Sequence, residues 1–380
     1  MKRKIIFSAN SLWFLYNFYS GLMLEFKNIG FDVVAIGKCD HTFSLIRELG
    51  ISAIAIPFKS KSAGILSNSC ILFNYLKLFK KYRPVCILNF TIKANIYGAI
   101  IARLFSIPCV NTQPGLGTVF LHGGLKSVIA KILYKHTAHY PCKLFVLNDD
   151  DYQLLLNTKL VPPEKLEIVH GSGIDIEKFA PMLNEENGKG EIRLLYIGRL
   201  LKDKGIHELV DVLRKMRSDN IRYLCKFVGF IDADNVSAIS ACEINKWEKE
   251  KLIRYEGFTN DVRKFIGDSD VVVLPSYREG LPQSLLEASA MEKVIVATNI
   301  QGCKDIVLDG YNGFICEPKN PESLYAAIKK AVALSPERRV EMGKNGRKYV
   351  SGKFEKSIIY KRYLDIVKAI TENIPEEFHL

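Results

Sequence analysis

Residues 193–210 read Arg-Leu-Leu-Tyr-Ile-Gly-Arg-Leu-Leu-Lys-Asp-Lys-Gly-Ile-His-Glu-Leu-Val, a short apolar run that leads through a basic turn into a helical pattern. The turn begins at Gly198 and ends at Gly205, and glycine lets a backbone approach a ligand closely. The start of the helix offers unpaired N–H groups to an anion, and Arg199 and Lys204 add two full charges. We therefore expect this turn to bind a diphosphate. A solvated basic turn is the alternative.

The same alternation of strand and helix runs through the whole chain. Continuous apolar runs, separated by helical patterns, indicate a parallel sheet that is covered on both faces. A polar, glycine-bearing segment at 184–190 separates two such series. The sequence thus predicts two doubly wound, Rossmann-like α/β domains that face each other across a cleft. We expect a first domain over 1–180, a second over 181–352, and a C-terminal helix over 353–380 that packs back on the first domain.

The composition is that of a globular protein with room for two domains, at 380 residues, 48% hydrophobic and 25% charged. It excludes a disordered chain, a collagen and a disulfide miniprotein. The nine cysteines are scattered without a C-x-x-C pair, which indicates free thiols in a reducing compartment rather than disulfides or a zinc site. Polar residues interrupt the uncharged run 5–24, which we interpret as a buried strand and a helix rather than a signal peptide.

A second motif, Pro275-Ser-Tyr-Arg-Glu-Gly-Leu-Pro-Gln-Ser-Leu-Leu-Glu-Ala288, follows another predicted strand. It carries Glu279 in a loop and Glu287 in the following helix. Two carboxylates could serve a glycosidase, but both lie on one side and leave the opposite face without an acid. Alternatively, they accept hydrogen bonds from vicinal hydroxyls, as the acidic residue of a dinucleotide site does with ribose. Glu279 could also simply cap the helix.

Together the two motifs resemble the retaining glycosyltransferases of family four, which have the GT-B architecture. The Gly-Arg-x4-Lys-Gly turn is followed about eighty residues later by Glu-Gly-Leu-Pro-x-Ser-x-x-Glu-Ala, and the resemblance covers 191–353. It implies that Arg199 and Lys204 bind the donor diphosphate and that Glu279 contacts the transferred sugar, these three being the catalytic residues. It also implies that Glu287 holds the ribose hydroxyls, that 181–352 is the nucleotide-sugar-binding domain and that 1–180 is the acceptor-binding domain. Further donor contacts are expected from Gly198, Gly229, Phe230, Phe258, Gly280, Leu281 and Pro282.

Three strand-end loops of the first half resemble a bacterial branch of this family that builds lipid-linked surface polysaccharides. Many members carry a histidine where this chain reads Gln113-Pro-Gly115. His122 follows shortly afterwards and could replace it, or it could be an ordinary surface residue. Lys93 could contact a phosphate of the donor or acceptor, or be solvated. The residues that we expect near the acceptor or the cleft are Asn10, Lys93, Gly115, Gly117, His122 and Gly173.

The resemblance also implies a reaction. The donor would be a nucleotide diphosphate sugar, with UDP preferred to GDP, and fixed cations would stabilise the leaving diphosphate. We expect no metal ion and no other cofactor, because those cations take the metal's role. Asp232-Ala-Asp234 is interpreted as a pair of solvated acids in a loop. Family resemblance implies retention of anomeric configuration, and we expect a same-face attack in which the departing phosphate takes the acceptor's proton.

The charge of the chain is distributed unevenly. The net charge is +12, but residues 1–180 hold 21 Lys and Arg against 11 Asp and Glu, whereas 181–380 hold 32 against 30. The first half therefore carries almost the whole excess. Basic residues mix with large apolar ones at 73–83 and 126–135, which predicts a face that binds an anionic membrane surface.

Such a face would bring the enzyme to a lipid-linked acceptor. We expect a polyprenyl-diphosphate-linked or lipid A-linked glycan, as in lipopolysaccharide synthesis, and a cytoplasmic protein that is peripheral on the inner face of the cytoplasmic membrane. A nucleotide-sugar epimerase on the same plan is an alternative that needs neither acceptor nor docking face. A nucleic-acid binder is disfavoured, because the sequence has no helix-turn-helix signal, no RNP-type aromatic motif and no zinc spacing.

Overall fold

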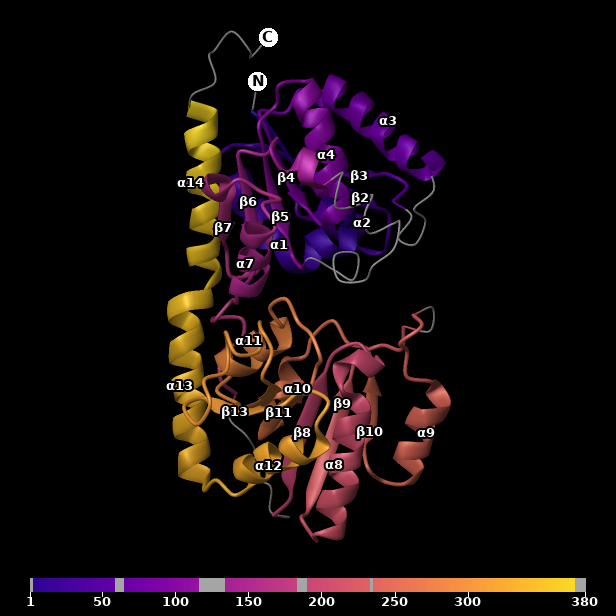
Figure 1. The fold of residues 1–380 in the computed structure, drawn as a ribbon, viewed down its shortest axis with the longest axis vertical. Helices are drawn as coiled ribbons and strands as arrows, with labels where there is room; N and C mark the ends of the chain where they lie inside the picture. The colour runs from indigo at the N-terminus through magenta and orange to yellow at the C-terminus, as the bar shows by residue number, and fades with distance from the viewer. Residues whose placement is uncertain (1–2, 59–64, 116–133, 183–189, 233–234, 373–380) are drawn as a thin grey trace. The chain divides into compact units, whose positions relative to one another are not determined.

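The computed structural model describes residues 3–58, 65–115, 134–182, 190–232 and 235–372. Packing divides the chain into two units, one formed by Met1–Ser172 with Ser357–Leu380 and the other by Gly173–Lys356. Each unit is a parallel sheet with helices on both faces, so the predicted pair of doubly wound α/β domains is confirmed (Figure 1). Among the described helices, none combines the length and the apolar character needed to cross a bilayer.

The first unit has a seven-stranded sheet in the order β3-β2-β1-β4-β5-β6-β7. Successive residues of a strand point to opposite faces. Ile5 and Phe7 of β1 therefore pack with helices α1 and α14, whereas Ile6 packs with α3 and α4. The strands are β1 (Lys4–Ser11), β2 (Asp32–Lys38), β3 (Ser52–Ala55), β4 (Cys86–Phe90), β5 (Cys109–Gln113), β6 (Lys143–Val146) and β7 (Leu166–Ile168). The helices are α1 (Leu12–Asn28), α2 (Thr42–Glu48), α3 (Ile65–Tyr82), α4 (Ile92–Leu104), α7 (Asp149–Asn157), the short 3-10 helix η1 (Pro163–Lys165) and α14 (Lys356–Glu372).

The end of the chain returns to the first unit through α14. The ring of Tyr363 packs edge-on against Phe145 with centroids 4.9 Å apart, and its hydroxyl lies 2.8 Å from the Thr112 Oγ1 atom. Where we expected the first domain to run to residue 180, Ile174 and Phe179 instead lie in the core of the second unit. The second unit therefore begins at Gly173.

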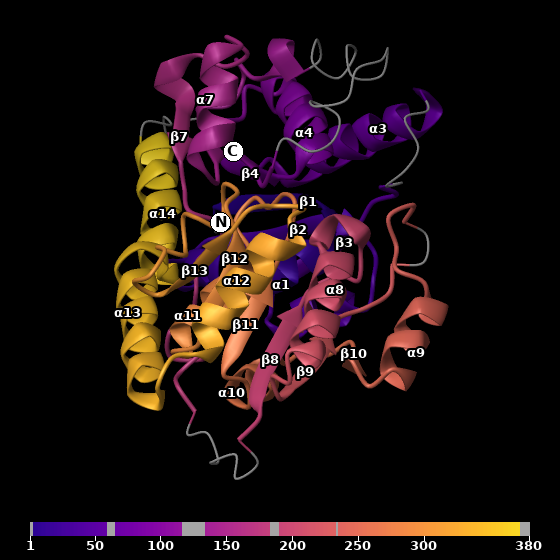
Figure 2. The same ribbon diagram turned by 60° about the horizontal axis from the view of Figure 1, so that its bottom comes forward.

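The second unit has a six-stranded parallel sheet in the order β10-β9-β8-β11-β12-β13. The chain adds strands outward on one side of β8 and then on the other side from β11, so the order of the strands reverses between β8 and β11. Ligands of doubly wound folds bind at such a reversal, at the carboxyl ends of the strands. Helices α8 and α12 lie side by side on one face, and α11 and α13 pack together on the other (Figures 1 and 2). The strands are β8 (Ile192–Ile197), β9 (Tyr223–Val228), β10 (Arg254–Gly257), β11 (Val271–Leu274), β12 (Val294–Thr298) and β13 (Gly313–Cys316). The helices are η2 (Lys202–Lys204), α8 (Ile206–Ser218), α9 (Ala241–Lys249), α10 (Arg263–Gly267), α11 (Gln283–Ala290), α12 (Pro321–Val332) and α13 (Pro336–Phe354).

Candidate active site

The two loops that carry the sequence motifs touch each other at the carboxyl edge of the second sheet. They follow the neighbouring strands β8 and β11. Gly205, which ends the first loop, has φ +69°, and a Cβ atom there would lie 2.0 Å from the Pro275 carbonyl oxygen of the second loop. The amide of Tyr277 donates a hydrogen bond of 2.9 Å to the Asp203 carbonyl oxygen. The backbones of the two motifs therefore form one surface.

Lys204 and Glu279, one from each loop, form an ion pair on this surface. The Lys204 Nζ atom lies 2.5 Å from Glu279 Oε1, and both side chains are about 85% buried, with exposures of 15% and 13%. The hydroxyl of Ser276 donates a second hydrogen bond of 2.6 Å to the same oxygen. One carboxylate oxygen of Glu279 is thus fixed by two donors, which sets the direction of the other.

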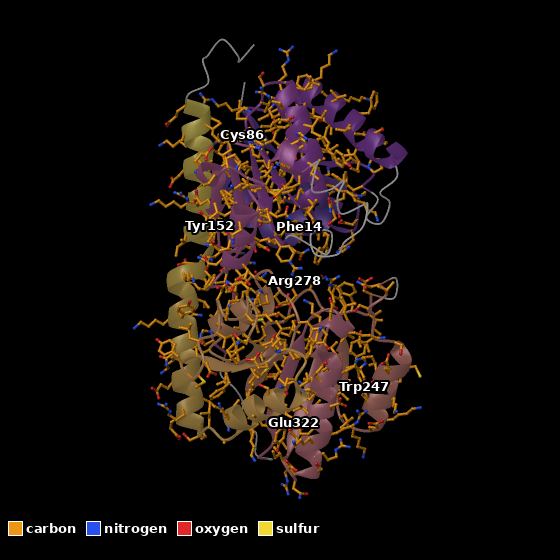
Figure 3. The ribbon with its side chains drawn as sticks, viewed as in Figure 1. Phe14, Cys86, Tyr152, Trp247, Arg278 and Glu322 are labelled. Carbon is orange, nitrogen blue, oxygen red and sulfur yellow. The ribbon has the colours of Figure 1, made fainter. Side chains whose placement is uncertain are left out.

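Arg199 stands at the same edge but is more exposed, at 48%. Its Nη1 atom lies 3.6 Å from Asp232 Oδ2, a partner that sequence reasoning missed because it took Asp232 for a solvated acid. The other acid of that motif, Asp234, lies outside the described residues. The buried hydroxyl of Tyr196 donates a hydrogen bond of 2.8 Å to the Arg199 carbonyl oxygen and so fixes its backbone. Arg278, beside Glu279, is a further exposed cation that the sequence analysis did not single out (Figure 3).

Two exposed aromatic rings lie beyond the ends of β9 and β10. Phe230 is 39% exposed and Phe258 is 52% exposed. Their centroids are 5.9 Å apart in an edge-to-face arrangement. Gly229 before them has φ +151°, and a Cβ atom there would lie 1.8 Å from the Gly198 carbonyl oxygen, so only glycine fits. The rings offer flat apolar surfaces on which a base could stack.

Glu287 lies in the second turn of α11, the helix that starts after Gly280, Leu281 and Pro282. No side chain caps the start of this helix. The Gly280 carbonyl packs against Gly302, where a Cβ atom would lie 2.4 Å away. Burial raises the pKa of Glu287 to about 8, against the attraction of the Lys178 and Lys356 ammonium groups.

The candidate residues of the first unit gather at the carboxyl edge of its own sheet. The backbone N–H of Asn10 donates a 3.1 Å hydrogen bond to Thr91 Oγ1. Thr91 has the strained φ of +81° at the start of α4. Lys93 follows in the first turn of α4, where burial lowers its pKa. Gly115 follows β5, and its carbonyl oxygen accepts a hydrogen bond from Gln113 Nε2. Gly117 and His122 lie outside the described residues.

A ladder of buried amide side chains supports this edge, and sequence reasoning missed it. Asn89 donates to Asn111 Oδ1 at 2.9 Å, and Asn111 donates to the Asn95 carbonyl oxygen at 3.1 Å. Asn95 in turn donates to Gln113 Oε1 at 3.0 Å. Buried hydrogen-bonded amides at successive strand ends fix the loops that follow. The feature of the sequence that could have revealed this ladder is the polar residues at the ends of otherwise apolar strands.

Gly173 is the first residue of the second unit. Gln283 of α11 donates a hydrogen bond of 3.3 Å from its Nε2 atom to the Gly173 carbonyl oxygen. The structure therefore joins Gly173 to the helix of Glu287 and not to Asn10 or Lys93, which belong to the first unit.

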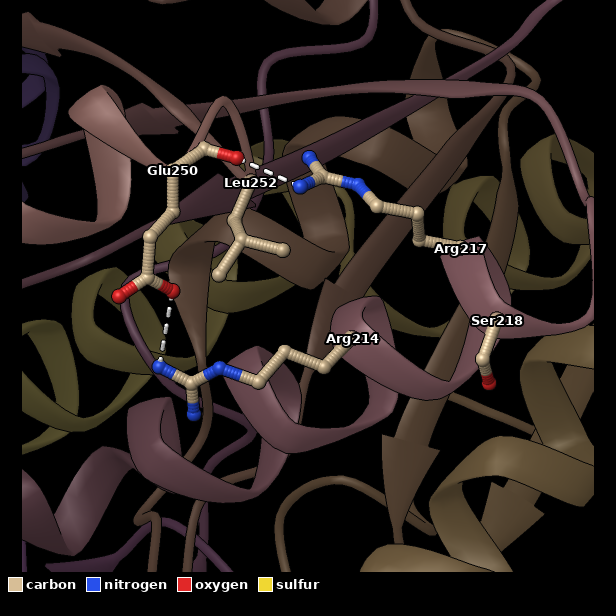
Figure 4. A pocket seen from close by; sticks show the side chains of 5 residues that line it. All are labelled: Arg214, Arg217, Ser218, Glu250 and Leu252. Carbon is tan, nitrogen blue, oxygen red and sulfur yellow. Dashed lines mark hydrogen bonds and ion pairs between the residues drawn. The ribbon is translucent and has the colours of Figure 1, made fainter.

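Other features of the chain stand apart from these motifs. A hollow of about 360 Å³ between the ends of α8 and α9 is lined by Arg214, Arg217 and Glu250, and both arginines donate hydrogen bonds to Glu250 (Figure 4). It lies near the amino edge of the sheet, where the Ile192 amide donates to the Arg222 carbonyl oxygen. All nine cysteines are free thiols. Over the described ranges, no three His, Cys, Asp or Glu side chains are grouped as metal ligands would be.

Comparison with known proteins identifies the family. Residues 182–349 match the sequence model of the group 1 glycosyl transferases. The chain is 26% identical over 379 residues to the N,N'-diacetylbacillosaminyl-diphospho-undecaprenol alpha-1,3-N-acetylgalactosaminyltransferase of Campylobacter jejuni, a match that covers 95% of this chain and 97% of the relative. It is also 26% identical over 314 residues to the UDP-Gal:alpha-D-GlcNAc-diphosphoundecaprenol alpha-1,3-galactosyltransferase of Escherichia coli, covering 79% of this chain and 80% of the relative.

A solved structure shares the fold. Anabaena HepE in complex with UDP and glucose superposes with a TM-score of 0.80 at 17% identity, covering 97% of this chain and 100% of that one. The family match falls on the unit that brings Arg199, Lys204, Glu279 and Glu287 to one edge of one sheet. With two doubly wound sheets, both motifs and relatives aligned along nearly its whole length, the chain is a glycosyl transferase of group 1.

Proposed function

We propose that this chain transfers a hexose or an N-acetylhexosamine from a UDP-sugar to a saccharide linked to a polyprenyl diphosphate, in the synthesis of a bacterial glycan. The observation that carries the proposal is that Lys204 and Ser276 both donate hydrogen bonds to one carboxylate oxygen of Glu279. This contact lies where the central strands β8 and β11 end. An oriented acid beside fixed cations suits a sugar that separates from a diphosphate.

The donor would lie along the carboxyl edge of the second sheet. Arg199 and Lys204 would bind its diphosphate, and Glu287 would accept hydrogen bonds from the ribose hydroxyls. The exposed rings of Phe230 and Phe258 would hold the base. UDP is preferred to GDP because the Escherichia coli relative is named for UDP-Gal and the Anabaena structure is described as a complex with UDP.

The chemistry then follows from where charge develops. As the glycosidic bond breaks, its electron pair passes to the β-phosphate oxygen, and Arg199 and Lys204 stabilise the growing charge. The acceptor hydroxyl attacks the sugar from the face that the diphosphate leaves, and the departing phosphate takes the proton. The anomeric configuration is thereby retained. No metal ion is needed in this scheme, because side-chain cations stabilise the leaving group.

The acceptor would bind the first unit, with Asn10, Lys93 and Gly115 at the carboxyl edge of its sheet. A polyprenyl diphosphate carrier is preferred to lipid A because both relatives are named for undecaprenol-linked substrates. A carrier of this kind is anchored in a membrane, so the protein would work at the inner face of the cytoplasmic membrane. The exposed basic residues of α3 would attract its anionic lipids.

A nucleotide-release assay tests the proposal. The full chain is incubated with a panel of UDP-sugars and GDP-sugars, with and without undecaprenyl-diphosphate-linked monosaccharides, and the released nucleotide is identified. We expect release of UDP that depends on the acceptor, with a product whose anomeric configuration matches the donor. Release of GDP, or release at the same rate without acceptor, would contradict the proposal.

A further inference from the structure

The helix that follows β1 brings a tryptophan to the edge of the first sheet where the acceptor candidates lie. β1 ends at Ser11, whose side chain caps α1 by accepting a hydrogen bond of 3.2 Å from the Phe14 amide. Trp13 therefore lies in the first turn of α1, three residues after Asn10, at the carboxyl edge of the sheet. It is partly exposed, whereas the other tryptophan of the chain, Trp247, is only 4% exposed.

Contacts from the neighbouring strand β2 fix the backbone that carries this ring. Asp40, which follows β2, accepts a hydrogen bond of 2.9 Å from the Trp13 amide at its Oδ2 atom. Its Oδ1 atom accepts from the amide and the hydroxyl of Thr42, at 3.0 and 2.6 Å. Gly37, near the end of β2, allows this approach, because a Cβ atom there would lie 2.7 Å from the Leu12 nitrogen. The start of α1 is thus held by a carboxylate that is itself fixed.

The indole ring of Trp13 is oriented by a second aromatic side chain. Phe18, further along α1, meets it edge-to-face, with centroids 5.8 Å apart and ring planes at 82°. Phe14 lies 5.0 Å from Phe18, and both of these rings pack against the buried core of the first unit. Within the described ranges, Trp13 has no second ring contact and does not itself pack against that core. The indole is therefore held in place while part of it stays open to solvent.

The surroundings of this ring suit an uncharged ligand. Two of the N–H groups at the start of α1 are already bonded to Ser11 and Asp40, and Asp40 adds a negative charge. A phosphate or an anionic membrane surface would be repelled there. A sugar ring is uncharged, and the C–H groups on one of its faces can lie flat on an aromatic ring while its hydroxyls reach polar partners. The ring of Trp13 therefore fits a sugar better than it fits the diphosphate or the lipid of the acceptor.

We propose that Trp13 binds the acceptor by stacking against the sugar that receives the transferred residue. The inference deepens the proposed function and rests on it, since that proposal brings the acceptor to this edge without naming a group that holds its sugar ring. Trp13 would contribute to the binding of the acceptor and leave the binding of the donor unchanged.

Acceptor kinetics test the inference with two probes that lack the long lipid. The first is the monosaccharide that gives the fastest UDP release in the nucleotide-release assay, joined through a diphosphate to a short alkyl chain. The second is the same alkyl diphosphate without the sugar. In W13A the acceptor KM for the first probe should rise about tenfold, as expected for the loss of one stacked ring, while kcat and UDP affinity stay close to those of the unaltered chain.

Matched variants show whether the flat ring is responsible. W13F keeps a flat aromatic surface and should keep most of the acceptor affinity, whereas W13L keeps the apolar bulk alone and should resemble W13A. F105A is the control, because Phe105 is 37% exposed and ends α4 at the opposite edge of the same sheet. It should leave the acceptor KM unchanged.

Tryptophan fluorescence reports the contact itself. In W247F, Trp13 is the single tryptophan, and the first probe should protect it from quenching by acrylamide, whereas the alkyl diphosphate should not. If W247F does not fold, the difference in quenching between the unaltered chain and W13F gives the same signal. Equal protection by the sugar-free probe, or by vesicles of anionic phospholipid, would overturn the inference.

The outcomes separate this inference from the proposed function. An unchanged acceptor KM in a folded, active W13A would overturn the role of Trp13 while the proposed transfer stands. If the unaltered chain releases no UDP with any of the diphosphate-linked monosaccharides, the proposed function itself fails. Thermal denaturation checks that each variant folds, and W13L carries the kinetic test if W13A does not.

Discussion

Arg199 combines exposure with a nearby anion, and this pairing bears on how it would act. Its Nη1 atom lies 3.6 Å from Asp232 Oδ2 and its side chain is 48% exposed, so the ion pair contributes little stability in water. A diphosphate that arrives at the loop could take the place of Asp232 at small cost. Arg199 would then hold two phosphate oxygens in the bidentate manner that guanidinium groups favour.

Replacing Arg199 should therefore affect the chemical step. In R199A we expect kcat to fall by about 100-fold or more, because a charge that stabilises the leaving diphosphate is lost. Steady-state kinetics with a UDP-sugar and a lipid-linked acceptor measure this. R254A is the matched control, since Arg254 is 66% exposed and also paired with a carboxylate, Glu256. A rise in KM alone would contradict the transition-state role.

A site residue could be predicted from the sequence when it lay within a local motif, but a contact between distant parts of the chain could not. Arg199, Lys204 and Glu279 each follow an apolar strand within a recognisable motif, so the sequence predicted them and the structure brings Lys204 and Glu279 within 2.5 Å. Nothing in the sequence pairs Arg199 with Asp232 or Lys356 with Asp175. Those contacts arise only when separate strands and the returning chain are packed.

At the scale of elements, the donor site depends on how closely the loop after β8 meets the loop after β11. Gly205 allows this contact for two reasons. It adopts a φ of +69°, which other residues rarely do, and it lacks a Cβ atom, which would lie only 2.0 Å from the Pro275 carbonyl oxygen. Gly310 has nearly the same backbone conformation, φ +73°, but a Cβ atom there would meet nothing within 4 Å. Substitutions at these two glycines can therefore distinguish the effect of backbone strain, present at both, from the effect of loop contact, present only at Gly205.

Alanine at these two positions should have different effects. G310A should lower the free energy of unfolding by about 1 kcal/mol, the strain of the left-handed conformation, and should leave UDP affinity unchanged. G205A should cost about 1–3 kcal/mol more, because the added methyl group forces the loops apart, and should weaken UDP binding as Lys204 separates from Glu279. Denaturant unfolding and calorimetry measure both. Equal UDP affinities in the two variants would show that the loop contact does not support the site.

The elements themselves could be predicted well where their apolar pattern was continuous. Within residues 193–210, the predicted apolar run corresponds to β8 and the helical pattern after the turn corresponds to the start of α8. The C-terminal helix was expected from residue 353, whereas α13 ends at Phe354 and α14 begins at Lys356, with Glu355 between them. Glu355 takes an extended conformation there and pairs with Ile174. A break made by such a distant backbone pairing leaves no local signal in the sequence.

At the scale of the whole molecule, the two units share one sheet plan and differ in charge. The second unit pairs several of its cations with acids, such as Lys204 with Glu279 and Arg193 with Asp270. On the first unit, helix α3 ends in a group of exposed basic residues next to Phe73, which is 67% exposed. Basic and aromatic side chains together are typical of a surface that binds an anionic membrane. The group consists of Lys77, Lys80, Lys81 and Arg83.

Neutralising that group should weaken membrane binding without touching the donor site. Each basic residue near an anionic leaflet contributes about 1 kcal/mol, so the fourfold glutamine variant should bind anionic vesicles at least about tenfold more weakly at low salt, while its UDP affinity stays unchanged. Vesicle sedimentation and calorimetry measure the two quantities. A control with the same change in net charge replaces four exposed lysines of the second unit, which are Lys264, Lys330, Lys344 and Lys348. If both variants lose vesicle binding equally, net charge and not the α3 surface determines it, and if neither loses it, the protein reaches its lipid-linked acceptor by another surface.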